Sequence, residues 1–507
     1  MPATNGTNDK KIVEAVKNGT LSEEVLDRAV ERILNVIFDF ADHRRDAQWD
    51  KEADHKLAQK IEEESAVLLK NDGILPLCPE KKAALIGLFA EKPRYQGGGS
   101  SHINSYKVTS AVEAAKEFAN VVYAKGYDVK EDKIEESLVK EAVEAAAASD
   151  YAVIFAGLPD SFESEGYDRS HMRMPDCQNH LIEEVLKVQP NTVIVLHNGS
   201  PVEMPWADKV KGILEVYLGG QAVGAAAINL LYGKANPCGK LAETIPLHLE
   251  DNPSYLNFPG DGKKVHYQEG LYVGYRYYDK KKMPVRYPFG YGLSYTTFEY
   301  KDLKLDKETM KDTDTLTVTL TVKNTGDRAG KEIVELYVSS PDQVMRPVRE
   351  LKNFVKVFLQ PGEEKEVTMT LNKRSFAGYS ERLHDWYVPS GSYKIQIGRS
   401  SRDIVLEKTV EVESTTVMPM EIDANTTVGD LMRNPKTADF IRSAMEKIQE
   451  VLGGGEQKEE SDAAKEAVSD EMNQAMMDSM PLRSLRSFNG LTNEALEEMI
   501  RQLKKIQ

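Results

Sequence analysis

Short apolar strands alternate with helices between residues 80 and 245, and this alternation constrains the fold more than any other feature. The predicted strands are 83–87, 121–123, 151–156, 192–197 and 212–217, and the predicted helices are 111–118, 134–148, 181–188 and 222–231. Strands that are apolar on both faces and separated by helices are typical of a mainly parallel sheet with helices on both sides. We therefore predict an α/β sandwich at 80–245.

The hydrophobic period changes to two between residues 300 and 412. Residues 316–322 alternate strictly between apolar and polar side chains, and 333–338, 367–371 and 393–397 keep the same period. About seven such strands with turns between them are typical of a β-sandwich of immunoglobulin or fibronectin type III kind. The chain is therefore predicted to be multidomain, with this sandwich after the α/β domain.

Four other segments flank these two domains. Residues 1–45 hold an amphipathic helix at 21–37, whose apolar face needs a partner that this segment does not supply. Residues 46–79 are predicted to form a linker and a helix at 54–70, and 246–299 a wrapped linker rich in Pro, Tyr and Gly. Residues 413–507 are predicted to form a helical extension, interrupted by glycines at 453–455 and a mobile charged linker at 456–470.

Charge and cysteine content exclude several classes of function. The net charge of −16 argues against nucleic-acid binding, which needs a basic face. No run of eighteen apolar residues occurs, so no membrane span is expected. The three scattered cysteines, Cys78, Cys177 and Cys238, form neither a disulfide framework nor a zinc motif. With no signal peptide in the sequence, we expect a cytoplasmic protein without a metal or cofactor.

Two carboxylates stand in one loop directly after the predicted strand 151–156, in Glu163-Ser-Glu-Gly-Tyr-Asp-Arg169. Open α/β sheets place ligand chemistry in loops at the carboxyl ends of their strands. A carboxylic acid there can donate a proton to a leaving oxygen if its pKa is raised. The alternative is a surface turn, or a Glu–Arg pair that only holds the loop.

A second candidate loop is Gly97-Gly-Gly-Ser-Ser101. Its glycines allow the backbone to approach a ligand closely, and its serines offer hydroxyl groups. A phosphate-binding loop would need a following Lys and a helix directly behind it, and neither is present. A sugar-contacting loop and a plain flexible turn both remain possible.

Several other residues attract attention but have structural interpretations. His197 ends a predicted strand, where packing or a hydrogen bond is its expected role. Glu269 is expected to form an ion pair with Arg276. The tyrosines of the wrapped linker are expected to pack between domains rather than to stack on sugars; they are Tyr272, Tyr275, Tyr277 and Tyr278.

Six stretches in register resemble the carboxyl-terminal portion of glycoside hydrolase family 3, close to its β-glucosidases. They are Glu64-Ser-Ala-Val-Leu-Leu-Lys-Asn-Asp-Gly-Ile-Leu-Pro-Leu77, Gly97-Gly-Gly-Ser100, Glu163-Ser-Glu-Gly-Tyr-Asp-Arg169, Asn236-Pro-Cys-Gly-Lys-Leu241, Gly270-Leu-Tyr-Val-Gly-Tyr-Arg-Tyr-Tyr278 and Pro288-Phe-Gly-Tyr-Gly-Leu-Ser-Tyr295. The sandwich at 300–412 is similar to the fibronectin-like domain that follows in many members. The tail resembles an extension of a bacterial subset.

The resemblance implies a retaining hydrolase with two catalytic carboxylates, acting on terminal non-reducing β-D-glycosyl residues of a glucoside or oligosaccharide. In the family the nucleophile is an Asp in a Ser-Asp-Trp sequence of an N-terminal (β/α)₈ barrel, and the acid/base is a Glu on a loop of the α/β sandwich. The family pattern selects Glu165 as acid/base, with Glu163 in reserve. Ser100 and Gly99 fall where a family loop touches the sugar.

The chain departs from the family in one respect that decides the mechanism. No barrel sequence is present, and 1–45 resembles only the end of one, with its last helix. The Ser-Asp pairs are Ser149-Asp150, Ser461-Asp462 and Ser469-Asp470, and none suits a nucleophile. We expect this chain to supply the acid/base half, to need a separate barrel polypeptide, and to be nearly inactive alone. The alternative is a non-catalytic carbohydrate-binding or interaction module.

Overall fold

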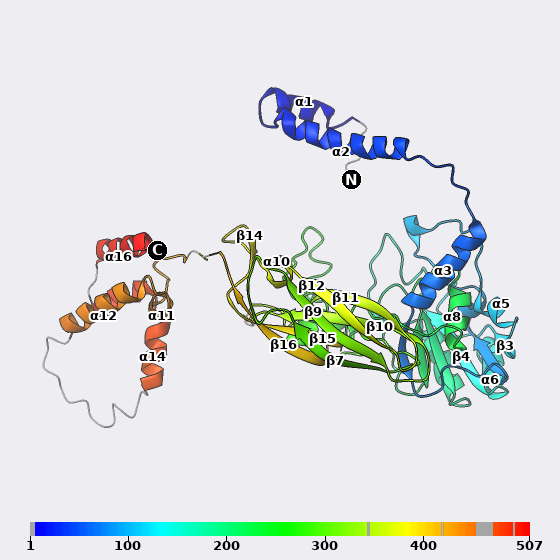
Figure 1. The fold of residues 1–507 in the computed structure, drawn as a ribbon. Coiled ribbons are helices and arrows are strands. Elements are labelled where there is room, and N and C mark those ends of the chain that lie inside the picture. The colour runs from blue at the N-terminus through cyan, green and yellow to red at the C-terminus, as the bar shows by residue number, and fades with distance from the viewer. Residues whose placement is uncertain are drawn as a thin grey trace.

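The computed structural model describes residues 6–341, 345–416, 418, 420–452, 470–489 and 492–506. They form an α/β domain, a β-sandwich beside it, and helices at both ends of the chain (Figure 1). The interruption at 453–455 and the charged linker up to 469 lie outside the described residues.

A six-stranded sheet forms the centre of the α/β domain, in the order β1-β6-β5-β4-β2-β3. Its strands are β1 (Val67–Asn71), β2 (Ala83–Ile86), β3 (Val121–Ala124), β4 (Tyr151–Gly157), β5 (Thr192–His197) and β6 (Gly212–Glu215). All neighbouring strands pair in parallel except β1, which runs antiparallel to β6. The predicted mainly parallel sheet is confirmed.

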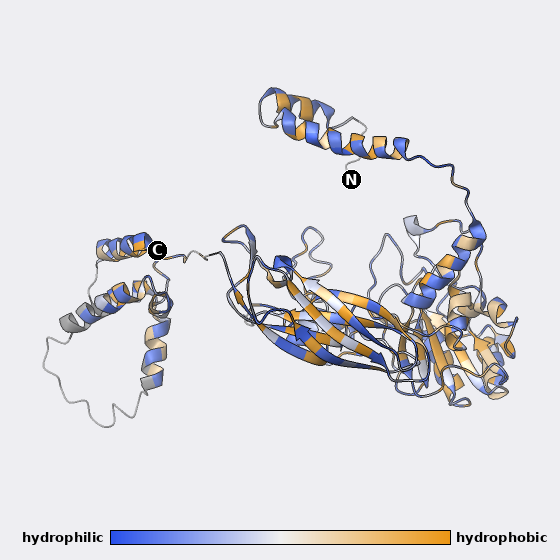
Figure 2. Cartoon of the chain, in the orientation of Figure 1, coloured by the Kyte–Doolittle hydropathy of each residue, from blue (hydrophilic) through white to orange (hydrophobic). Residues whose placement is uncertain are grey.

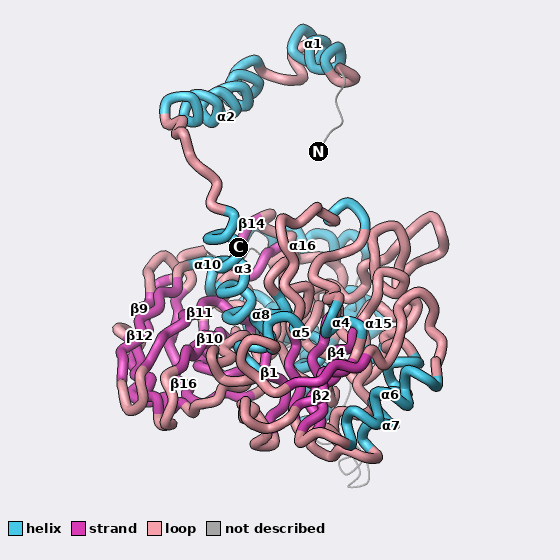
Figure 3. Tube along the Cα trace, turned by 90° about the vertical axis from the view of Figure 1, so that its right-hand side faces the viewer, coloured by secondary structure: helices cyan, strands magenta, loops and turns pink. Residues whose placement is uncertain are grey.

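Helices cover both faces of this sheet. The helices are α3 (Lys51–Ser65), α4 (Leu88–Glu91), α5 (Ala111–Ala115), α6 (Glu136–Ala147), α7 (Asp176–Leu186) and α8 (Val223–Leu231). The connection from β2 to β3 contains α5, and the connection from β3 to β4 contains α6. These two connections move across the sheet in opposite directions, so right-handed crossovers place α5 and α6 on opposite faces. Contacts agree, because α5 and α3 touch α8 whereas α6 touches α7 (Figure 3).

The helix predicted at 54–70 is wrong at its end. Helix α3 stops at Ser65, and the apolar residues after it form the edge strand β1. Leu68 and Leu69 are fully buried there, because β1 pairs with β6 more than 140 residues later. Such long-range pairing overrides a local helical period. The predicted strand 212–217 is also shorter and ends at Glu215.

The second domain is the predicted β-sandwich. Its sheets have the orders β11-β10-β15-β16-β8 and β12-β9-β7, with a two-stranded β13-β14 ribbon. The strands are β7 (Phe298–Leu305), β8 (Thr309–Lys311), β9 (Leu316–Asn324), β10 (Gly330–Ser339), β11 (Glu350–Leu359), β12 (Glu364–Leu371), β13 (Gly378–Ser380), β14 (Asp385–Tyr387), β15 (Gly391–Ser400) and β16 (Asp403–Glu413). A short helix, α10 (Lys373–Phe376), follows β12. Burial alternates along β9, as the two-residue period requires.

The wrapped linker 246–299 joins the two domains. It carries the helix α9 (Tyr275–Lys281), and a bridge from Leu293 to Leu68 ties it to the sheet of the α/β domain. Tyr275 stacks on Phe289 with 4.5 Å between ring centroids, and its hydroxyl accepts a hydrogen bond of 2.9 Å from the backbone N–H of Leu351. Buried Tyr275 thus packs at the domain boundary, as predicted. Buried Tyr278 contacts Tyr277 of the same helix instead, with 5.5 Å between ring centroids.

The amino-terminal helices α1 (Asp9–Lys17) and α2 (Glu23–Asp42) contain no buried residue. The large apolar side chains of α2 are exposed, among them Ile33, Val36, Ile37, Phe38 and Phe40. Figure 2 shows alternating apolar and polar bands along this helix, which lies away from both domains. The apolar face predicted to need a partner has none among the described residues.

The carboxyl-terminal extension is helical, as predicted. Its helices are α11 (Val428–Arg433), α12 (Ala438–Leu452), α14 (Asp470–Ser479), α15 (Leu485–Asn489) and α16 (Asn493–Ile506). A small core that includes Leu431, Ile441, Leu482 and Leu503 holds them together. No helix in the described part of the chain is both long and apolar enough to cross a membrane.

Candidate active site

The loop with the two carboxylates lies at the carboxyl edge of the sheet. Strand β4 ends at Gly157, and the loop from Leu158 to Arg169 follows it directly. The neighbouring β5 ends at His197, and residues 198–201 continue from it beside the loop. Because parallel strands end at one edge, these two loops meet where such folds place their ligand sites.

Glu163 is the anchored carboxylate of the loop. Its side chain is 18% exposed, and it accepts a hydrogen bond of 2.7 Å from Nη1 of Arg94, which is only 6% exposed. The backbone N–H of Gly199 donates at 2.8 Å, and the hydroxyl of Ser200 donates as well. Arg94 also binds the carbonyl oxygens of Leu158 and Glu163, each at 2.8 Å. The expectation that Glu163 holds the loop therefore agrees with these contacts.

These contacts keep Glu163 ionised. Burial alone would raise the pKa of its carboxyl, but hydrogen bonds from Ser200, Arg94 and Gly199 hold that pKa below its ordinary value. A carboxylate stabilised in this way is a poor proton donor near neutral pH. Glu163 is therefore poorly suited to act as a general acid in this state of the chain.

Glu165, two residues further on, is exposed and lies against the glycine-rich loop. Its Oε2 accepts a hydrogen bond of 2.6 Å from the backbone N–H of Ser100 and another from the Ser100 hydroxyl. These bonds lower the pKa of Glu165. A Cβ at Gly99 would lie 2.5 Å from the Cβ of Glu165, and Gly99 has a φ of +82°, so this close approach requires glycine. The structure thus brings the two predicted loops together at Glu165.

Sequence reasoning missed three groups around these loops. Arg94 precedes the glycine-rich loop and gave no local signal, because its partners are more than sixty residues away. Ser200 links Glu163 to Arg169, whose Nη1 donates to the Ser200 hydroxyl at 2.8 Å. Glu215 is fully buried at the end of β6 and accepts from Asn198 at 3.1 Å. A single acid in an otherwise apolar strand was the signal for Glu215.

The structure also shows the surroundings of three other residues that the sequence analysis considered. Asp150 accepts a hydrogen bond of 2.9 Å from the backbone N–H of Lys82 at the amino edge of β4, far from the candidate site. His197 is fully buried and its Nδ1 lies 3.1 Å from the carbonyl oxygen of Arg94, which fits the packing role. The predicted ion pair between Glu269 and Arg276 is wrong, because Arg276 instead binds Glu350 at 3.2 Å. No cluster of three or more metal-binding side chains occurs among the described residues.

A buried acid near this edge gives a pH-dependent prediction. Glu62 is 5% exposed, its Oε1 has no hydrogen-bond partner in the described structure, and burial raises its pKa from 4.5 to about 8. The folded state therefore binds this proton more tightly than the unfolded state. The contribution of protonated Glu62 to the free energy of unfolding is therefore complete below pH 4.5, and it is lost as the pH rises through about 8.

We expect Glu62→Gln to remove this loss, since glutamine does not ionise. The free energy of unfolding of the variant relative to the parent should rise by roughly 3–4 kcal/mol between pH 4.5 and 8. Urea unfolding followed by Trp206 fluorescence measures it, in a Trp49→Phe, Trp386→Phe background. The exposed Glu117→Gln should show no such rise. A flat difference for Glu62→Gln would contradict the prediction.

Comparisons with known proteins agree with this architecture. The model of the glycosyl hydrolase family 3 C-terminal domain matches residues 66–295, and that of the fibronectin type III-like domain matches 332–401. The thermostable β-glucosidase B of Acetivibrio thermocellus is 51% identical over 100% of this chain and 67% of its own length. An exo-α-(1→6)-L-arabinopyranosidase of Bifidobacterium breve is 42% identical over 80% of this chain and 55% of its own length.

Solved structures give the same result. The crystal structure of a family 3 β-glucosidase of Bifidobacterium adolescentis superposes with a TM-score of 0.79 at 40% identity. The match covers 86% of this chain and 65% of that protein. The chain therefore spans between about half and two thirds of the length of these relatives.

Proposed function

This chain belongs to glycosyl hydrolase family 3, and on that premise we propose that it is the acid/base portion of a β-glucosidase-like hydrolase. The substrate class is a glucoside or oligosaccharide with a terminal non-reducing β-D-glycosyl residue. The observation that carries the proposal is the position of Glu165, exposed at the carboxyl edge of the sheet and held by the Ser100 loop.

The proposed reaction retains configuration at the sugar. Glu165 donates a proton to the leaving oxygen while a nucleophilic carboxylate attacks the anomeric carbon, and Glu165 then removes a proton from water to release the sugar. We assign that nucleophile to a (β/α)₈ barrel polypeptide outside this sequence. Asp150 is unsuited to the role, because its carboxylate binds the backbone N–H of Lys82 at the amino edge of the sheet. The exposed apolar face of α2 supports this assignment, since it offers the barrel a packing surface.

The barrel would also prepare Glu165 for its role. In the chain alone, hydrogen bonds from Ser100 hold the pKa of Glu165 below its ordinary value, which disfavours proton donation. A second carboxylate brought nearby and the exclusion of water both raise the pKa of a carboxyl group. Ser100 can then turn its hydroxyl to the bound sugar. An isolated chain that binds but barely turns over substrate is the expected consequence.

Complementation tests the proposal. Hydrolysis of an aryl β-glucoside should be negligible for the 507-residue chain and for a family barrel polypeptide separately, and should appear when the two are mixed. A chain with Ile33→Asp and Phe40→Asp on α2 should need much more barrel for the same rate. Activity of the chain alone would contradict the assignment of the nucleophile. No activity in the mixture would favour the non-catalytic carbohydrate-binding or interaction module.

A further inference from the structure

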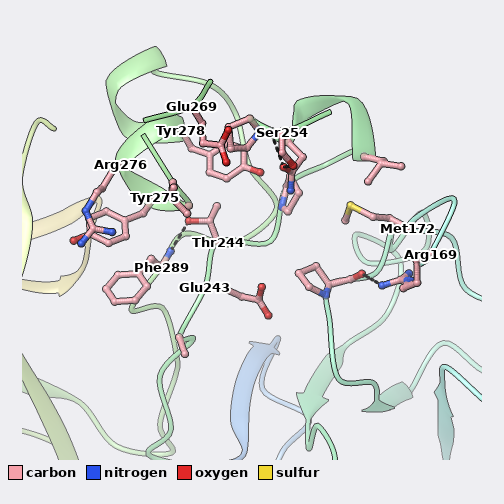
Figure 4. A pocket seen from close by; sticks show the side chains of 18 of the residues that line it. Arg169, Met172, Glu243, Thr244, Ser254, Glu269, Tyr275, Arg276, Tyr278 and Phe289 are labelled. Atoms are coloured by element: carbon pink, nitrogen blue, oxygen red, sulfur yellow. Dashed lines mark hydrogen bonds between the residues drawn. The ribbon is translucent and has the colours of Figure 1, made fainter. Parts of the chain in front are cut away.

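A cavity of about 630 Å³ opens between the α/β domain, the wrapped linker and the β-sandwich (Figure 4). It is separate from the contact between Glu165 and Ser100, neither of which lines it. Its volume falls within the roughly 300–1,000 Å³ of sites that hold small organic ligands. The cavity is therefore large enough for a mono- or disaccharide.

Polar side chains with unsatisfied atoms belong to the lining of this cavity. Oε2 of Glu269 and Nη2 of Arg169 are buried and have no hydrogen-bond partner in the described structure. Glu243 forms no hydrogen bond or ion pair with the described residues, and burial raises its pKa to about 7. Figure 4 shows Glu243 on one side of the open centre and Glu269 on the opposite side. Buried polar groups are costly unless a partner satisfies them, which indicates a polar ligand here.

The remaining lining defines the class of ligand. Tyr278 and Phe289 add aromatic surface to the lining, which suits the C–H groups of a sugar ring. The two carboxyl groups can accept hydrogen bonds from hydroxyl groups, and Arg169 can donate to hydroxyl oxygens. The carboxylates oppose an anionic ligand, whereas Arg169 opposes a cationic one. A neutral polyhydroxylated ligand meets all of these conditions.

We propose that this cavity is a second carbohydrate site, which binds a neutral mono- or disaccharide between Glu243, Glu269 and Arg169. The site is distinct from the reacting centre assigned to Glu165. It uses neither that residue nor a barrel, so it does not depend on the proposed catalytic function. Because its walls come from both domains and the linker between them, sugar binding there also joins the domains more firmly.

The test is sugar binding by the complete chain, followed at the Met172 methyl group, which lines the cavity. In NMR titrations, D-glucose and cellobiose should shift this signal saturably, with a dissociation constant on the order of 1 mM. D-glucuronate should bind at least tenfold more weakly because of Glu243 and Glu269. Each of Glu243→Gln and Glu269→Gln should weaken glucose binding about tenfold.

Two controls make the result specific. The exposed Glu250→Gln next to the cavity should leave glucose affinity unchanged. Unchanged methyl spectra without sugar would show that the variants fold. Absence of a saturable Met172 shift, or equal glucose affinity in parent, Glu243→Gln and Glu269→Gln, would overturn the proposal even if barrel complementation succeeds.

Discussion

Replacing Glu165 by glutamine in the complex with a barrel should lower kcat/KM for alkyl β-glucosides by roughly 10²–10⁴-fold. Their leaving oxygen needs a proton, and the amide cannot supply it. The dinitrophenolate group of a dinitrophenyl β-glucoside departs without a proton. The kcat/KM for this substrate should therefore fall less than about tenfold. Its kcat should still drop, because release of the sugar needs a general base. The measurement is steady-state kinetics with both classes of leaving group.

Two controls connect this result to proton transfer. Azide attacks without losing a proton, so it should restore kcat of Glu165→Gln on the dinitrophenyl substrate and form the glycosyl azide. Glu163→Gln should instead lower kcat/KM similarly for both leaving groups, because Glu163 positions the loop through Arg94 and Gly199. An equal loss for both substrates in Glu165→Gln, without azide rescue, would contradict the acid/base role.

Replacing Arg94 by leucine should destabilise the α/β domain by about 3–5 kcal/mol. The guanidinium is 6% exposed and binds the carboxylate of Glu163 together with two loop carbonyl groups. Its removal leaves a largely buried negative charge and unpaired carbonyl oxygens. Urea unfolding followed by Trp206 fluorescence in the background described above measures the loss.

A double-mutant cycle separates the ion pair from packing. Glu163→Gln in the Arg94→Leu chain should restore part of the lost stability, because a neutral amide needs no buried counter-charge. The exposed Arg173→Leu should change stability by less than about 0.5 kcal/mol. A loss at Arg94→Leu no larger than at Arg173→Leu would show that the anchor contributes nothing measurable.

The sequence alone determined the two domains and the place of the candidate loop. Period and composition are local properties, and they predicted the apolar strands of the parallel sheet and the alternation that builds β9. The loop at 163–169 follows β4 directly, so its position at the carboxyl edge came from the same pattern. The edge strand β1 was missed because only its pairing with β6 distinguishes it from the end of α3.

Only the tertiary structure decided what the acidic residues of this chain do. Glu163 and Glu165 stand in one short motif, yet Arg94 buries the first in an ion pair while Ser100 meets the second at the surface. Arg276 finds Glu350 rather than its near neighbour Glu269. The surroundings of a carboxyl group, and hence its charge and role, come from partners distant in sequence, and no local pattern encodes which of them the fold brings within reach.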